Sequence, residues 1–109
     1  MRSHVKKAFW KLFDALSPEV QKQAFEAYEQ FQHDPFSPGL NFEEVNKRVG
    51  LWSARVNDNV RVLGYREGDE IIWFWIGTHA EYERRKRRGQ IAIPSAQGSK
   101  FETWPAAST

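Results

Sequence analysis

The stretch IIWFWIGTHAEYERRKRRG, residues 71–89, decides which fold the chain can adopt. Residues 71–76 are apolar on both faces of a strand, which is typical of an interior strand that other layers cover on both sides. Thr78 and Glu81 follow with the spacing of a capping box, in which two residues satisfy the free N–H groups at the start of a helix. We therefore predict a central strand at 71–76 and a short helix at 80–88.

Two more strand-like runs come before this stretch. Residues 51–56 and 60–65 are separated by the sequence NDN, and the sequence REGD follows the second run. Both separators have the composition of hairpin turns, and connections this short place successive strands side by side in antiparallel order. Residues 40–42 alternate apolar and polar side chains as a short strand does. The pattern predicts an antiparallel meander.

The N-terminal third has the periodicity of helices. Apolar residues recur at helical spacing in residues 5–16 and again in residues 18–32, and Ser17 suits the N-cap of the second helix. We predict an α+β domain over residues 1–88, in which two N-terminal helices pack on an antiparallel β-sheet and a short C-terminal helix follows. Residues 89–109 are expected to form an extended or partly disordered tail.

Composition and length fit one small soluble domain. The chain has 109 residues, of which 40% are hydrophobic and 15% aromatic, so it can bury a core of its own. It has no cysteine, as is common in a reducing cytosol, and its charged N-terminus lacks the apolar segment of a signal peptide. Its longest apolar run is far shorter than the about 20 residues that span a membrane. We expect a cytoplasmic protein with no membrane contact.

The net charge of +2 is unevenly distributed. Residues 1–46 contain five Lys/Arg and seven Asp/Glu, whereas residues 47–88 contain ten and six. We therefore expect an anionic partner to bind the C-terminal half of the fold, although a basic run is also common on a purely solvated face. The side chains that we predict to contact the phosphates of a nucleic acid are Lys47, Arg48, Arg84, Arg85, Lys86, Arg87 and Arg88.

His79 is the histidine whose position suggests chemistry. It directly follows the buried central strand, where a rigid element holds a side chain in place, and imidazole titrates near neutrality. A lone histidine is nevertheless more often structural, and His4 and His33 have no comparable setting. The sequence contains no metal-ligand spacing and no glycine-rich phosphate loop. We therefore predict chemistry on a phosphodiester that needs neither metal nor cofactor.

Arg55 and Arg61 lie on either side of the NDN turn, in strands predicted to be neighbours. As cross-strand partners on one face they would place two guanidinium groups side by side, which costs free energy unless an anion lies between them. A phosphate fits, because a guanidinium group donates paired hydrogen bonds to its oxygens. The alternative is two exposed arginines paired with Asp58, Glu67 or Glu81.

Several segments, taken in order, resemble the small toxins of the RelE/ParE superfamily, the toxic halves of bacterial type II toxin–antitoxin pairs. The similarity covers roughly residues 5–86. The segments that carry it are FWKL at 9–12, LSPEV at 16–20, DP at 34–35, LWSARV at 51–56, VRVL at 60–63 and WFWIGTHAEYE at 73–83. The resemblance implies two helices on an antiparallel sheet and a cognate antitoxin as partner. Only a few residues precede Val5, which leaves little room for the first strand of the family.

The superfamily resemblance also implies an activity. RelE-like members cut messenger RNA on the ribosome with basic side chains of the sheet and a late His, Arg or Tyr. By this resemblance Arg61 and Arg55 correspond to the basic sheet positions, and His79 and Tyr82 to the late catalytic residues. ParE-like members instead inhibit DNA gyrase and are not nucleases. We predict a ribosome-dependent messenger RNA endonuclease; the alternatives are a gyrase inhibitor without catalytic activity and a non-toxic interaction module of the same fold.

Overall fold

The computed structural model describes residues 1–87, with side chains as far as Arg84. The predicted tail at 89–109 lies outside the described residues. No helix in the described part of the chain is long and apolar enough to cross a membrane. The elements, in chain order, are β1 (Arg2–Val5), α1 (Lys7–Asp14), α2 (Pro18–His33), the 3-10 helix η1 (Pro38–Leu40), β2 (Glu43–Asn46), β3 (Leu51–Arg55), β4 (Val60–Glu67), β5 (Glu70–Thr78) and α3 (His79–Arg87).

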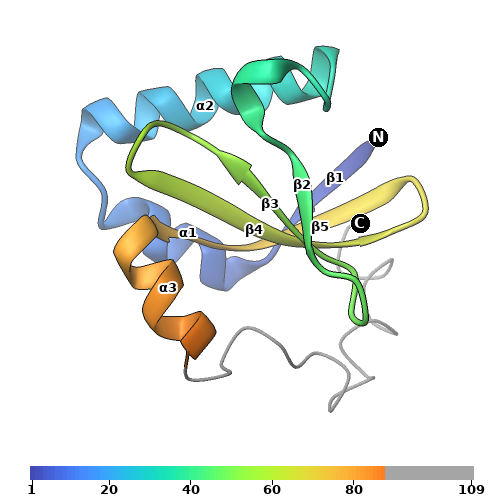
Figure 1. The fold of residues 1–109 in the computed structure, drawn as a ribbon. Helices are drawn as coiled ribbons and strands as arrows, with labels where there is room; N and C mark the ends of the chain where they lie inside the picture. The colour runs from blue at the N-terminus through green and yellow to red at the C-terminus, as the bar shows by residue number, and fades with distance from the viewer. Residues whose placement is uncertain (88–109) are drawn as a thin grey trace.

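The strands form one five-stranded sheet in the order β1-β5-β4-β3-β2. Strands β2 to β5 pair in antiparallel order, as the meander predicts, and β5 lies in the interior of the sheet between β1 and β4. Figure 1 shows α2 crossing one face of this sheet, with α3 at the end of β5. The predicted α+β architecture with two N-terminal helices is confirmed.

The N-terminus differs from the prediction. Residues 2–5 form β1, which pairs in parallel with β5, so the first helix starts two residues later than predicted and the otherwise antiparallel sheet has one parallel pair. Without β1, the outer edge of β5 would expose unpaired backbone groups. The N–H of Lys6 donates to the carbonyl of Trp73 at 3.0 Å, and α1 begins one residue later. Four residues are therefore enough for the first strand.

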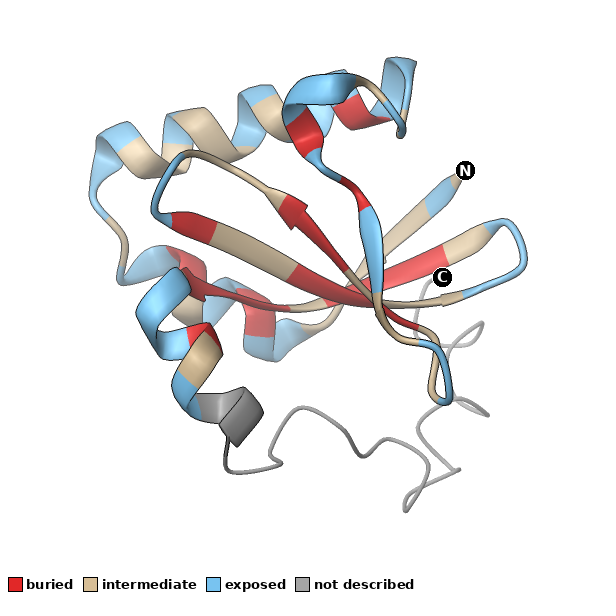
Figure 2. Cartoon of the chain, in the orientation of Figure 1, coloured by how far each residue is buried: buried red, intermediate tan, exposed pale blue. Residues whose placement is uncertain are grey.

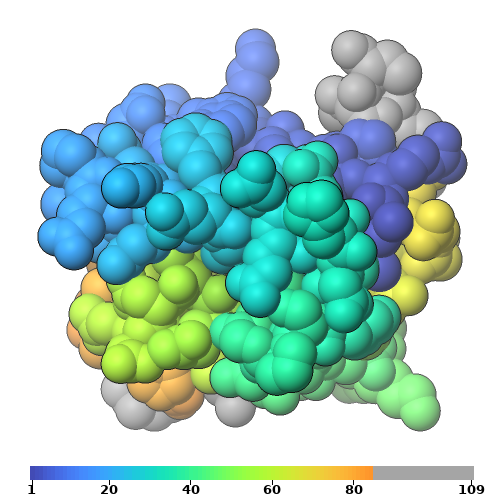
Figure 3. Space-filling model, turned by 90° about the horizontal axis from the view of Figure 1, so that it is seen from above, coloured from blue at the N-terminus to red at the C-terminus, as the bar shows by residue number. Residues whose placement is uncertain are grey.

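The segment between α2 and the meander also differs from the prediction. Residues 40–42 are not a strand: Leu40 ends η1, and β2 begins only at Glu43. Pro38 at the start of η1 has no N–H to donate to a sheet, and Asn41 has a left-handed backbone with φ of 45°. The alternation was misleading because Leu40 is buried beneath α2 rather than in a strand. Figure 3 shows the face that α1, α2 and this segment cover.

A β-bulge in β5 changes the face of the sheet on which its aromatic side chains pack. Leu63 pairs with Trp75, but Gly64 pairs with Trp73, so Phe74 is an extra residue in the ladder. Residues two apart on a regular strand share a face. Here Trp73 instead packs with Phe9, Phe13 and other residues beneath the helices, whereas Trp75 packs with Leu63 on the opposite face. Figure 2 shows buried residues concentrated along β3, β4 and β5.

Candidate functional site

The site begins where β5 passes into α3. The N–H of Thr78 donates to Glu81 Oε1 at 2.9 Å, and the N–H of Glu81 donates to Thr78 Oγ1 at 3.1 Å, so the predicted capping box is confirmed. The helix starts at His79, one residue before the predicted start. The N–H of His79 donates to the carbonyl of Asn59 at 2.7 Å. These bonds anchor α3 on both β5 and the β3–β4 turn.

Tyr82 is the centre of the site. Its side chain is buried against Leu63 and Trp75 on the face of the sheet opposite α2. Its ring centroid lies 6.0 Å from that of His79 and 6.0 Å from Cζ of Arg61. Burial raises the pKa of Tyr82 above its usual value, the positive charge of Arg61 opposes this, and two nearby glutamates add to it. The phenol is therefore neutral at physiological pH and can donate a hydrogen bond.

Arg61 approaches this tyrosine from β4. Its Nη1 donates to the hydroxyl of Ser53, a fully buried side chain on β3, at 3.2 Å. The cross-strand partner of Arg61 on β5 is Gly77. A Cβ atom at residue 77 would lie 2.6 Å from the Trp75 ring and 2.7 Å from a carboxylate oxygen of Glu81, which is too close unless these groups shift. Within residues 1–84 no carboxylate forms an ion pair with Arg61. The guanidinium group is thus oriented by a neutral partner and keeps its charge available to an anion.

Arg55 lies elsewhere, although its backbone is where the sequence predicts. Arg55 and Arg61 are Cα partners across β3 and β4. The Arg55 guanidinium group forms an ion pair with Asp58 and donates to the carbonyl of Gly39 at 3.3 Å, on the side of α2 and η1. The two guanidinium groups therefore do not lie together on one anion. Asp58, one of the partners expected in the alternative interpretation, neutralises Arg55.

His79 is an exposed residue. Its side chain is 51% accessible, and its Nε2 lies 3.5 Å from a carboxylate oxygen of Glu83 one turn along α3. By contrast His4, to which the sequence assigns no role, is only 16% accessible, and its Nε2 lies 3.1 Å from Glu70 Oε1. That pair lies at the other end of β5 and depends on β1, a strand that the sequence does not predict. Among the described residues, no three side chains of the metal-binding types converge.

The predicted RNA-binding residues fall into two separate places. Lys47 and Arg48 lie in the β2–β3 turn, at the end of β3 away from Arg55 and Arg61. Arg84 is exposed on α3, and residues 85–87 continue that helix. Arg88 lies outside the described residues. Positive charge therefore lies at both ends of one face of the sheet.

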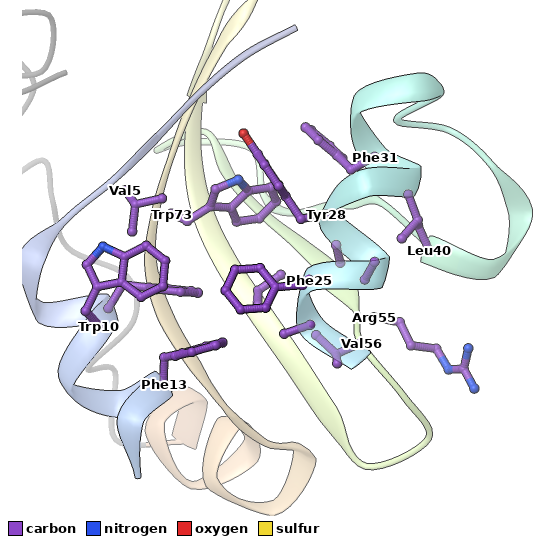
Figure 4. A pocket seen from close by; sticks show the side chains of 15 residues that line it. Val5, Trp10, Phe13, Phe25, Tyr28, Phe31, Leu40, Arg55, Val56 and Trp73 are labelled. Atoms are coloured by element: carbon purple, nitrogen blue, oxygen red, sulfur yellow. The ribbon is translucent and has the colours of Figure 1, made fainter. Parts of the chain in front are cut away.

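An apolar groove lies on the opposite, helix-covered side. It has a volume of about 260 Å³ and is lined by α1, α2 and the sheet. Figure 4 shows Trp10, Phe25 and Tyr28 around it, and all three are exposed. Phe31 is the buried residue of α2, so the apolar stripe of this helix is only partly covered. The helical periodicity of residues 18–32 predicts a helix packed on the sheet, but it does not predict this groove. Exposed apolar patches of this kind mark interaction sites.

Comparison with known proteins gives one family and one fold. The family model of the ParE-like toxin domain matches residues 18–84. A search among curated proteins finds no match. The chain is similar in structure to the RelE of a RelB–RelE antitoxin–toxin complex from Methanococcus jannaschii, with TM-score 0.61 and 16% identity over 74% of this chain and 95% of that one. It is also similar in structure to a YoeB/ParE toxin from Agrobacterium tumefaciens, with TM-score 0.58 and 14% identity over 72% of this chain and 99% of that one. The match to a chain of a YoeB–YefM complex from Staphylococcus aureus has TM-score 0.54 and 14% identity over 72% of this chain and 97% of that one.

Proposed function

The chain belongs to the ParE-like toxin domain family and has the fold of RelE and YoeB toxins, and we propose that it cleaves messenger RNA on the ribosome. The observation that carries this proposal is the cluster of Arg61, Tyr82 and His79 at the end of the sheet. It combines a cation oriented for an anion, a neutral phenol and an imidazole beside a carboxylate. Groups of these kinds can stabilise the charge and transfer the protons of a phosphodiester transfer.

The ribose supplies the nucleophile in the reaction. Its 2′-oxygen attacks the adjacent phosphorus, the bond from phosphorus to the 5′-oxygen breaks, and the products are a 2′,3′-cyclic phosphate and a 5′-hydroxyl. Arg61 stabilises the negative charge that develops on the phosphate oxygens. His79 transfers a proton, either to the leaving 5′-oxygen or from the 2′-hydroxyl, and Glu83 orients the imidazole. Tyr82 packs beside the ring of His79 and orients it.

The basic residues at the two ends of the sheet face are proposed to dock RNA. Lys47 and Arg48 in the β2–β3 turn and Arg84 on α3 present their charges to solvent, as contacts with backbone phosphates require. The same role for residues 85–88 is proposed from the sequence alone. Arg55 is expected to contribute less than Arg61, because Asp58 already neutralises it.

The decisive experiment exposes two targets to the same preparation of toxin. We expect translating ribosomes to yield messenger RNA cut within the occupied A-site codon, with a cyclic phosphate on the upstream fragment. Supercoiling by purified DNA gyrase should be unaffected at the same toxin concentration. Intact message together with inhibited gyrase would instead establish the non-catalytic alternative.

We further propose that an apolar segment of the cognate antitoxin fills the groove beside α2. Structures of this fold include toxin–antitoxin complexes, which supports an antitoxin as the partner. Phe25 is 56% accessible at the mouth of the groove, and edge-to-face contact with Phe13 holds its ring in place with centroids 5.3 Å apart. An exposed aromatic ring of this kind can anchor a protein interface. Arg55, which also lines the groove, can pair there with an acidic side chain of the partner.

Phe25→Ser tests this groove. We expect the variant to bind the antitoxin about 10- to 100-fold more weakly in a titration, because an anchor ring is typically worth about 2 kcal/mol or more. Phe36→Ser is the matched control, since Phe36 is 58% accessible but does not line the groove. Equal affinities of both variants and the wild type would show that the antitoxin docks elsewhere.

A further inference from the structure

A stacked aromatic pair lies on the face of the sheet that carries Arg61. The rings of Tyr65 on β4 and Phe74 on β5 are parallel to within 7°, and their centroids are 4.4 Å apart. Both side chains are half-buried and pack beside Leu51 and Trp75 rather than beneath the helices. Together the two partly exposed rings form an aromatic surface on the face of the sheet that carries Arg61.

The β-bulge of β5 creates this pair. On a regular strand Phe74 and Trp75 would point to opposite faces. Because Phe74 is the extra residue in the ladder, both side chains instead pack on the face opposite α2. Bulges are frequent next to functional sites, where they redirect a side chain. Phe74 does not pack in the core beneath the helices, so the bulge adds its side chain to the opposite face of the sheet.

The position of the pair relative to the cations completes the pattern. Tyr65 is four residues from Arg61 on the same strand and the same face, a separation of about 13 Å. Tyr65 is also the cross-strand partner of Leu51, which directly follows the turn that carries Lys47 and Arg48. The aromatic surface therefore lies between a cation at the reacting end and two cations at the far end. Alternating basic and aromatic groups along one face are typical of proteins that bind single-stranded nucleic acid.

We propose that Tyr65 and Phe74 form a nucleobase subsite, on which a base of the messenger RNA near the cleaved bond stacks while its backbone runs from Arg61 towards Lys47 and Arg48. This inference rests on the proposed ribonuclease function. In this proposal the sheet helps to position the message so that the reacting phosphate lies at Arg61. Burial raises the pKa of Tyr65 to about 12, so its phenol stays uncharged beside the polyanion.

The test measures single-turnover cleavage of message on programmed ribosomes at increasing toxin concentration. We expect Tyr65→Leu and Phe74→Leu each to raise the toxin concentration for half-maximal rate about 5- to 150-fold, because stacking on a protein ring is worth about 1–3 kcal/mol per base. The rate at saturating toxin should change little, unlike that of a catalytic variant. Phe74→Tyr, which keeps the ring, should behave as the wild type. Phe36→Leu is the control, an exposed ring that packs against Phe42 beneath the helices.

Messages with one abasic ribose, scanned across the nucleotides on either side of the cleaved bond, identify the stacked base. For the wild type, one abasic position should weaken the toxin as much as Phe74→Leu does, and combining the two changes should add little further loss. If folded Phe74→Leu and Tyr65→Leu proteins cut as the wild type does, the subsite does not exist although the nuclease function stands. If these variants lose affinity for the antitoxin alone, the rings bind protein and the proposal fails. If the wild type cuts no message on ribosomes, the subsite falls together with the proposed function.

Discussion

Arg61→Ala is expected to lower the rate of message cleavage on ribosomes by about 10²–10³-fold at saturating toxin. The guanidinium group is the charged donor beside Tyr82, and the buried Ser53 hydroxyl holds it there at 3.2 Å. The loss should appear in the rate and not in the toxin concentration for half-maximal rate, because the charge that Arg61 stabilises develops only in the transition state. Quenched single-turnover assays on programmed ribosomes measure both quantities.

The chain offers a matched control for this variant. Arg55 is the cross-strand partner of Arg61 and carries the same charge, but its guanidinium group is held by Asp58 and the carbonyl of Gly39. We expect Arg55→Ala to keep its rate at saturating toxin. Arg61→Lys should recover only part of the rate, because an ammonium group cannot donate the paired hydrogen bonds of guanidinium. Equal losses from Arg55→Ala and Arg61→Ala would mean that both arginines reach the substrate and that Asp58 releases Arg55 on binding.

The parts of the fold that the sequence predicts are those fixed by local chemistry. The capping box of Thr78 and Glu81 needs only two residues three apart, and Ser17 caps α2 by the same kind of bond. The two predicted hairpin turns fix the antiparallel order of β3, β4 and β5 in the same way. Strand β1 escaped prediction because its four residues acquire their partner, β5, from the far end of the chain. No pattern within a short stretch of sequence can predict a pairing between strands so far apart in the chain.

The candidate site is predictable to the level of the backbone and no further. The register of Arg55 and Arg61 follows from the turn between them, but their guanidinium groups separate because each finds its own partner. The burial of Tyr82 and the exposure of His79 follow from the angle at which α3 leaves β5, which the capping box alone does not determine. The bulge at Phe74 is invisible in a run in which every neighbour is apolar.

His79→Ala is expected to lower the rate at saturating toxin by about 10²–10⁴-fold, the usual contribution of a proton-transfer group. Tyr82→Phe should cost much less, because the buried ring that packs beside His79 is kept and only its hydroxyl is lost. His79→Ala should retain the wild-type unfolding temperature, since the side chain of His79 is half exposed. A larger loss in Tyr82→Phe than in His79→Ala would assign the proton transfer to the phenol.

A message with sulfur in place of the leaving 5′-oxygen at the cleaved bond shows which proton His79 moves. A thiolate leaves without being protonated, because a thiol is far more acidic than an alcohol. If His79 protonates the leaving group, His79→Ala should cut this message nearly as fast as the wild type does, whereas Arg61→Ala should remain slow. If His79→Ala stays slow on the sulfur-containing message, its imidazole accepts the proton of the 2′-hydroxyl instead. Cleavage of ordinary message by His79→Ala at the wild-type rate would remove the histidine from the chemistry and leave Arg61 and Tyr82 as its only candidates among the clustered residues.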